Sequence, residues 1–129
     1  MSDCYRLAST ALGSRVTVHA HVHATAEAML AAAAAFTGET LSERAQGVTQ
    51  AWWDEEERAT QILVQLNEEH LTHDVISHEM AHAAHALYGA TLPDDALARD
   101  HLTHFNETLA HLHTDLYTGL LHKLHRRRR

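Results

Sequence analysis

Hydrophobic and polar residues alternate along residues 15–24, where valine and alanine occupy every second position and threonine and histidine lie between them. This period of two predicts a strand with one buried face. We expect two more strands at 47–53 and 59–66, the latter with Ile62, Val64 and Leu66 on one face. These two lie close together in the chain, separated by the acidic turn 54–57, so we expect them to form a hairpin.

Three other segments carry a helical pattern. Thr25 is a suitable N-cap for an alanine-rich helix that Gly38 would end. A second helix follows Asn67, has Gly89 at its end, and shows apolar residues at helical spacing: Val75, Ile76, Met80, Ala83, Ala84 and Leu87. After a loop at 90–93, a long helix is predicted over 94–125, with an apolar stripe of Leu102, Phe105, Leu109, Leu112, Leu116 and Leu120.

The predicted order β-α-β-β-α-α, with strands early and helices late, indicates an α+β fold. We expect a small sheet of three strands or slightly more, packed on the second helix and on the long C-terminal helix. The length of 129 residues fits a single domain, which we place at 1–125. Residues 126–129 are all arginine, and we expect this basic tail to be solvated.

The formal net charge is −7, and the chain before the arginine tail holds six basic against 17 acidic residues. Such an acidic surface argues against nucleic acid as a partner. Cys4 is the single cysteine, so no intrachain disulfide can form. The chain begins without a signal-peptide pattern, and the alanine run 31–35 is too short to span a bilayer. We therefore expect a cytoplasmic protein without a membrane partner, as a monomer or homodimer.

The candidate chemistry lies in the second helix, in the segment His78-Glu79-Met80-Ala81-His82. Histidines four residues apart project from one helix face and can bind one zinc ion, while the adjacent glutamate can act as general base toward a water. With fourteen histidines in the chain, random composition yields about 0.1 such matches. The strongly amphipathic setting of the motif therefore carries as much weight as the motif itself.

A catalytic zinc site also needs a third protein ligand. His85 is two helical turns from His78, too far to share the same ion. The metzincin pattern requires Gly at 85 and His at 88, but this chain has His85 and Tyr88, which excludes that subclass.

With Asn106-Glu107 downstream, the chain resembles the gluzincin metallopeptidases, over roughly residues 47–125. The resemblance implies that His78, His82 and Glu107 bind zinc, that Glu79 is the base, and that the substrate is a peptide or protein. His104 and His111 flank Glu107 on the same helix face and are alternative third ligands. Asp115 could orient His111, and Tyr88 and Tyr117 more plainly suit helix packing.

The sequence is also compatible with two other functions. The chain could be a non-catalytic zinc-binding regulatory or interaction protein, or an intracellular regulatory protease resembling the ImmA/IrrE group. Three further features have structural explanations. We expect His19, His21 and His23 to lie on the exposed face of their strand. We expect Trp52 and Trp53 to face opposite sides of theirs, one toward the core and one toward a cleft or interface. If that strand forms the sheet edge, a peptide could add to it.

Overall fold

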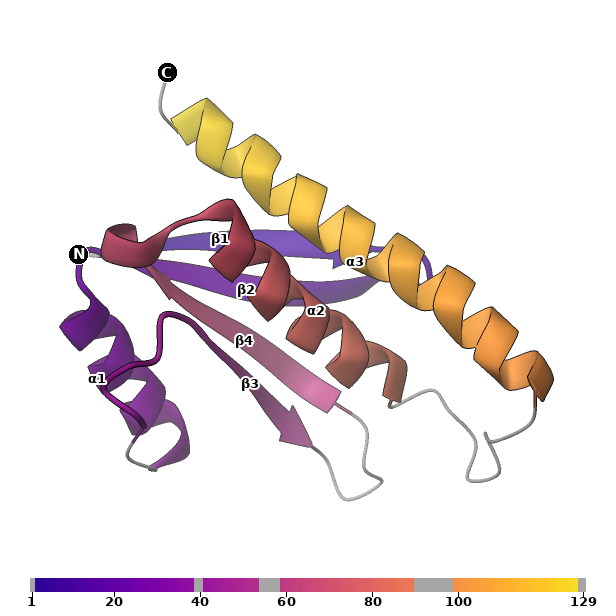
Figure 1. The fold of residues 1–129 in the computed structure, drawn as a ribbon, viewed down its shortest axis with the longest axis horizontal. Helices are drawn as coiled ribbons and strands as arrows, with labels where there is room; N and C mark the ends of the chain where they lie inside the picture. The colour runs from indigo at the N-terminus through magenta and orange to yellow at the C-terminus, as the bar shows by residue number, and fades with distance from the viewer. Residues whose placement is uncertain (1, 39–40, 54–58, 90–98, 128–129) are drawn as a thin grey trace.

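The computed structural model of the protein describes residues 2–38, 41–53, 59–89 and 99–127, and describes no side chain over 99–107. It confirms the α+β class, with a four-stranded mixed sheet and three helices, the last of them long (Figure 1). The elements are β1 (Ser2–Ser9), β2 (Val16–His23), α1 (Ala26–Thr37), β3 (Val48–Trp53), β4 (Ala59–Asn67), a short 3-10 helix (Glu68–His70), α2 (His73–Gly89) and α3 (Arg99–Arg127). No helix in these ranges is both long and apolar enough to cross a membrane.

The strands are arranged in the order β1-β2-β4-β3. The predicted hairpin is confirmed, because β3 pairs with β4 in antiparallel register. β2 runs parallel to β4, and α1 and β3 form the crossover between them. β1, which pairs antiparallel with β2, was not predicted from the pattern: only Leu7 and Ser9 of this strand are buried. β3 lies at one edge of the sheet.

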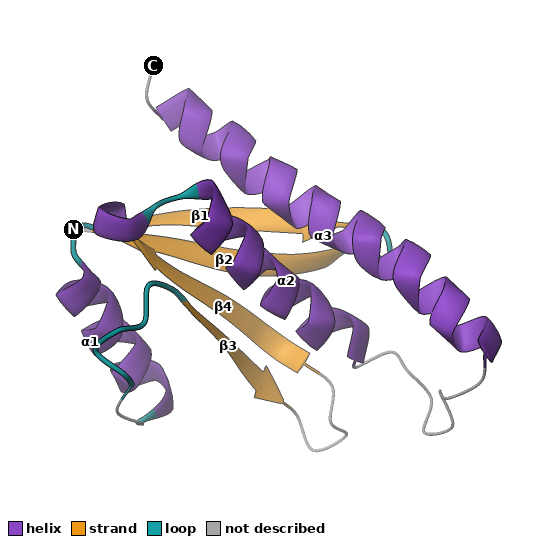
Figure 2. Cartoon of the chain, in the orientation of Figure 1, coloured by secondary structure: helices purple, strands orange, loops and turns teal. Residues whose placement is uncertain are grey.

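The two faces of the sheet are covered by different helices (Figure 2). Ile62, Val64 and Leu66 of β4 belong to the main core, which α2 and α3 close over one face. The intervening residues of β4 point the other way, toward α1, where Asn67 donates a hydrogen bond to the sulfur of Met29. The predicted alternation thus marks two covered faces rather than one buried and one exposed face.

The helix ends follow the capping rules. Thr25 accepts a hydrogen bond from the backbone N–H of Ala28, and Gly38 adopts a left-handed conformation with φ of 78°, so both predicted ends of α1 are confirmed. α2 has a cap that the pattern did not indicate: the Thr72 hydroxyl accepts from the N–H of Val75. The loop 90–93, the acidic turn 54–57 and the predicted start of the last helix at 94–98 lie outside the described residues.

Contrary to the prediction, His19, His21 and His23 of β2 do not lie on an exposed face. His23 is only 8% exposed, and its Nε2 lies 2.8 Å from Oε1 of Gln65. His19 and His21 are half-buried. The prediction of an exposed face was wrong because α1, reached through the crossover, packs over part of this face. Burial, together with nearby His23 and His19, lowers the pKa of the His21 imidazole.

The expectation of a solvated tail beginning at residue 126 was also wrong in part. α3 continues to Arg127, whose guanidinium lies 2.9 Å from Asp3 and 2.8 Å from Glu68. Burial opposes the charge of this guanidinium, but the hydrogen bonds that it donates to the two carboxylates outweigh this effect and raise the pKa of Arg127. The helix extends this far because Leu124, 6% exposed, still packs on the core.

Candidate metal centre and its cleft

His78 and His82 lie on one face of α2, as predicted from their spacing, and both are exposed. Their Nε2 atoms are 3.1 Å apart, and the two rings meet edge to face with centroids separated by 4.6 Å. The helix places the two imidazoles on successive turns of one face, which brings their Nε2 atoms together.

This convergence suits a zinc ion. Two nitrogens that share a tetrahedral zinc at about 2.0–2.1 Å are separated by about 3.3 Å. The observed 3.1 Å is close to that edge length. In the absence of a cation, the same approach requires one ring to donate its Nε2 proton to the other. The separation of the pair therefore fits either two nitrogens on one ion or a hydrogen bond between the rings.

Glu79 has a different environment from its histidine neighbours. It is 5% exposed, whereas His78 and His82 face solvent. The Thr49 hydroxyl donates to Oε1 of Glu79 over 2.8 Å and also lies 3.1 Å from the Glu79 backbone carbonyl. Among the described residues, none donates a hydrogen bond to Oε2. Glu79 also lines the cleft described below, so this oxygen is left for a water or a ligand in that space.

The two histidines and Glu79 open into one cleft between α2 and β3, with a volume of about 470 Å³. Its other walls come from β3, from the segment before it and from one further residue of α2. They consist mostly of small and apolar residues: Leu41, Ser42, Ala45, Gly47, Val48, Thr49, Ala51 and Ala86. A chain segment can therefore approach the three polar groups along the free edge of β3.

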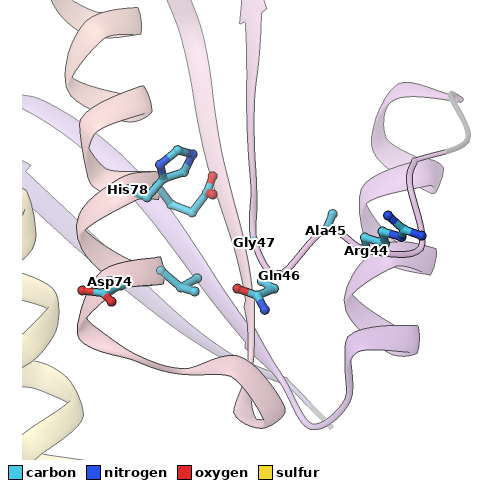
Figure 3. Close-up of a pocket in the computed structure, with 8 residues that line it drawn as sticks. Arg44, Ala45, Gln46, Gly47, Asp74 and His78 are labelled. Carbon is cyan, nitrogen blue, oxygen red and sulfur yellow. The ribbon is translucent and has the colours of Figure 1, made fainter.

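The cleft continues past His78 into a second hollow of about 440 Å³ (Figure 3). Figure 3 shows His78 and Asp74 on α2 at one side, and the segment 44–47 at the other. Arg44, on that segment, is exposed. This half of the cleft thus carries charged and polar side chains, whereas the half along β3 is mainly apolar.

The third ligand cannot be assigned from the described side chains. Glu107 and His104 belong to α3, but both fall within 99–107, outside the described side chains. His111 is described and lies exposed on α3, and the described residues contain no group of three potential ligands. The structure therefore does not bring His111 to the histidine pair, and Glu107 stays a prediction.

The other residues near the motif have structural partners. Nδ1 of His85 lies 2.8 Å from the Ala81 carbonyl, and Tyr88 is buried at 2% exposure in the core. The Tyr117 hydroxyl lies 3.0 Å from Nδ1 of His73. Asp115 accepts a hydrogen bond from Ser9 rather than serving His111 in any contact described. Both tyrosines thus have the packing roles that the pattern indicated.

The roles of two residues of the site, Gly47 and Thr49, were not predicted from the sequence. A glycine at the start of a strand often marks a close backbone approach, and this signal was present at Gly47. Nothing in the sequence identifies Thr49, because its role depends on which strand packs beside α2. The tryptophans differ from their prediction in one respect: Trp52 is 58% exposed and contacts Phe36 of α1, on the face away from the cleft. The Trp53 side chain lies outside the described ones.

No protein-family model, curated protein or solved structure matches the chain. The likeness to gluzincins therefore rests on His78, Glu79, His82 and Glu107 themselves.

Proposed function

We propose that this protein is a zinc-dependent peptidase. The observation that carries the proposal is the placing of two imidazole nitrogens 3.1 Å apart in the same cleft as a buried glutamate. A pair of solvated histidines would explain the first feature alone. It would not explain why Glu79, next in sequence to one of them, is buried with one oxygen left without a described donor.

In this proposal His78 and His82 hold the ion, and Glu107 is the third ligand implied by the resemblance. Zinc, when bound, supplies a Lewis acid that polarises a carbonyl and acidifies water. Glu79 accepts a proton from the attacking water at its open oxygen, Oε2. The same carboxyl then delivers that proton to the nitrogen of the departing amine. Its burial in the wall of the cleft keeps Glu79 beside the two histidines.

The substrate in this proposal is an extended peptide or a protein segment. β3 is an edge strand, so its outer backbone groups can pair with an added strand. Val48, Thr49 and Ala51 of this strand line the cleft together with the histidines. This mode of holding a peptide is the one that the gluzincin resemblance implies. A cytoplasmic setting is part of the proposal, in keeping with the single cysteine.

Substitution of the base tests the proposal. Glu79→Gln should keep zinc and lower kcat on a cleaved peptide by at least about 100-fold, because the amide cannot take a proton from water. Glu27→Gln, at an exposed position in the first turn of α1, is the matched control and should keep both zinc and activity. Zinc bound without cleavage of any peptide in a broad library would favour the non-catalytic regulatory or interaction protein instead.

A further inference from the structure

We propose that Thr49 is a positioning residue for Glu79: its hydroxyl holds Oε1 of the carboxylate, so that Oε2 is left for a water or a substrate group. This inference rests on the peptidase proposed above, because it concerns how the general base of that site is held. It assigns a role in the site to β3 beyond that of a strand to which a peptide can add.

The contact joins two separate elements. The Thr49 hydroxyl lies 2.8 Å from Oε1 of Glu79, whereas the Glu79 carbonyl is more distant at 3.1 Å. A threonine hydroxyl has one proton to donate, so the shorter bond goes to the carboxylate. A bond to a charged acceptor is also stronger than one to a neutral carbonyl. The geometry therefore favours the side chain of Glu79 as the main partner.

The sheet gives Thr49 a fixed place. On β3, Thr49 pairs with Val64 of β4, which is fully buried. Thr49 is also β-branched, and such side chains have few accessible rotamers. Glu79 has several rotatable bonds and would otherwise sample many positions in the cleft. A rigid donor on the sheet thus restricts a flexible acceptor on the helix.

Gly47 bounds Glu79 on a second side. A Cβ built on Gly47 would lie 3.2 Å from Oε2 and nearer still to the carbons of the glutamate side chain. Without a side chain at 47, the carboxylate fits between the backbone of this residue and the hydroxyl of Thr49. Oε1 is then bonded to Thr49, and Oε2 is left for a water or a substrate group.

The alternative is an ordinary structural role, in which the hydrogen bond of the Thr49 hydroxyl only stabilises the fold. The two roles differ in what the hydroxyl does when the carboxylate is absent. If Thr49 acts through Glu79, removing the hydroxyl should matter only while the carboxylate is present. If Thr49 merely stabilises the strand, removing the hydroxyl should have the same effect in either background.

A double-mutant cycle on the metal-free protein makes this comparison. Thr49→Val keeps the shape and removes the donor, and Glu79→Met removes the acceptor at similar length. In the wild-type background, Thr49→Val should lower the midpoint of urea unfolding by about 0.5 M. In the Glu79→Met background it should leave the midpoint unchanged or raise it. Equal shifts in the two backgrounds would overturn the proposal.

Kinetics provide an independent readout. Thr49→Val should lower kcat at least about tenfold with little change in KM, because a loosely held base acts mainly in the chemical step. Thr49→Ser retains the hydroxyl and should recover most of the loss. Thr17→Val, at a half-buried strand position on β2, controls for the general loss of a strand hydroxyl and should be near wild type. A Thr49→Val enzyme with wild-type kcat would overturn the proposal.

The two measurements separate the inference from the proposed function. If the wild-type protein cleaves no peptide, the peptidase proposal fails, but the unfolding cycle still decides whether Thr49 holds Glu79. If the protein cleaves peptides and the cycle shows no coupling, the peptidase stands and the role of Thr49 falls.

Discussion

The backbone of Gly47 approaches the side chain of Glu79 so closely that a Cβ on the glycine would lie 2.8 Å from Cγ of the glutamate. Real Cβ atoms essentially never show so short a contact, so any larger residue must displace the glutamate. Displacing Glu79 from this place would break its hydrogen bond with Thr49. The segment before β3 thus needs a glycine at this position for the base to keep its place.

Substitution of this glycine should therefore impair the site more than the fold. Gly47→Ala should lower kcat at least about tenfold and destabilise the protein by about 1 kcal/mol or more through overpacking. Peptide hydrolysis and urea unfolding measure the two effects.

Gly119→Ala is the matched control. Its Cβ would meet only Cδ2 of Leu7 at 3.9 Å, and the residue lies within α3. This substitution should stabilise the protein by up to about 1 kcal/mol, because alanine favours a helix more than glycine does. A Gly47→Ala protein as stable and active as the Gly119→Ala protein would contradict the close approach.

The third zinc ligand can be identified by metal affinity. Glu107→Ala should weaken zinc binding more than about 100-fold, which exceeds the loss typical of residues that only support a ligand. His104→Ala and His111→Ala should each weaken it about tenfold or less. Competition with a chelator of known affinity measures all three variants under the same conditions. The largest loss in His104→Ala would instead assign a third histidine to the site.

The stability of the protein should depend on pH through His21. The pKa of this imidazole is lowered in the folded state by burial and by its histidine neighbours. The unfolded chain, with the ordinary value of about 6.5, therefore binds a proton more readily than the folded chain. The free energy of unfolding should thus fall as pH drops below about 6.5 and level off below the folded pKa.

Substitution of His21 tests this origin. His21→Gln removes the group that titrates, so the variant should lose less stability than wild type between pH 7 and pH 5. Urea unfolding at a series of pH values gives the comparison. Identical pH profiles for the two proteins would show that the dependence arises from other residues.

The elements with strong periodicity could be predicted from the sequence. β2, the β3–β4 hairpin, α1 with both of its ends, and the helix that carries His78 all lie where the pattern placed them. These predictions succeeded because apolar positions at period two or 3.6 directly reflect which side of an element is buried.

The elements and contacts that could not be predicted depend on packing between segments that are distant in sequence. β1 presents only Leu7 and Ser9 as buried residues, so its strand structure comes from pairing with β2. His23 is buried because α1 packs over its face of the sheet, which the order of residues does not reveal. Arg127 is held by Asp3 and Glu68, which are distant in sequence.

Some features of the candidate site could likewise be predicted from local helix geometry, whereas others depend on tertiary packing. The spacing of His78 and His82 predicted their convergence, because it depends only on helix geometry. The burial of Glu79 and its bond to Thr49 could not be predicted, because they require β3 to lie beside α2. The position of Glu107 relative to the pair depends on how α3 packs, and its role rests on resemblance.

The zinc content of the purified protein tests the central claim most directly. After removal of loosely bound metal by gel filtration, the wild-type protein should contain about one equivalent of zinc. His78→Ala and His82→Ala should each lose most of it. His85→Ala, an exposed histidine on the same helix, should retain it. Less than about half an equivalent in the wild-type protein, or equal retention in all three variants, would contradict a zinc site built on His78 and His82.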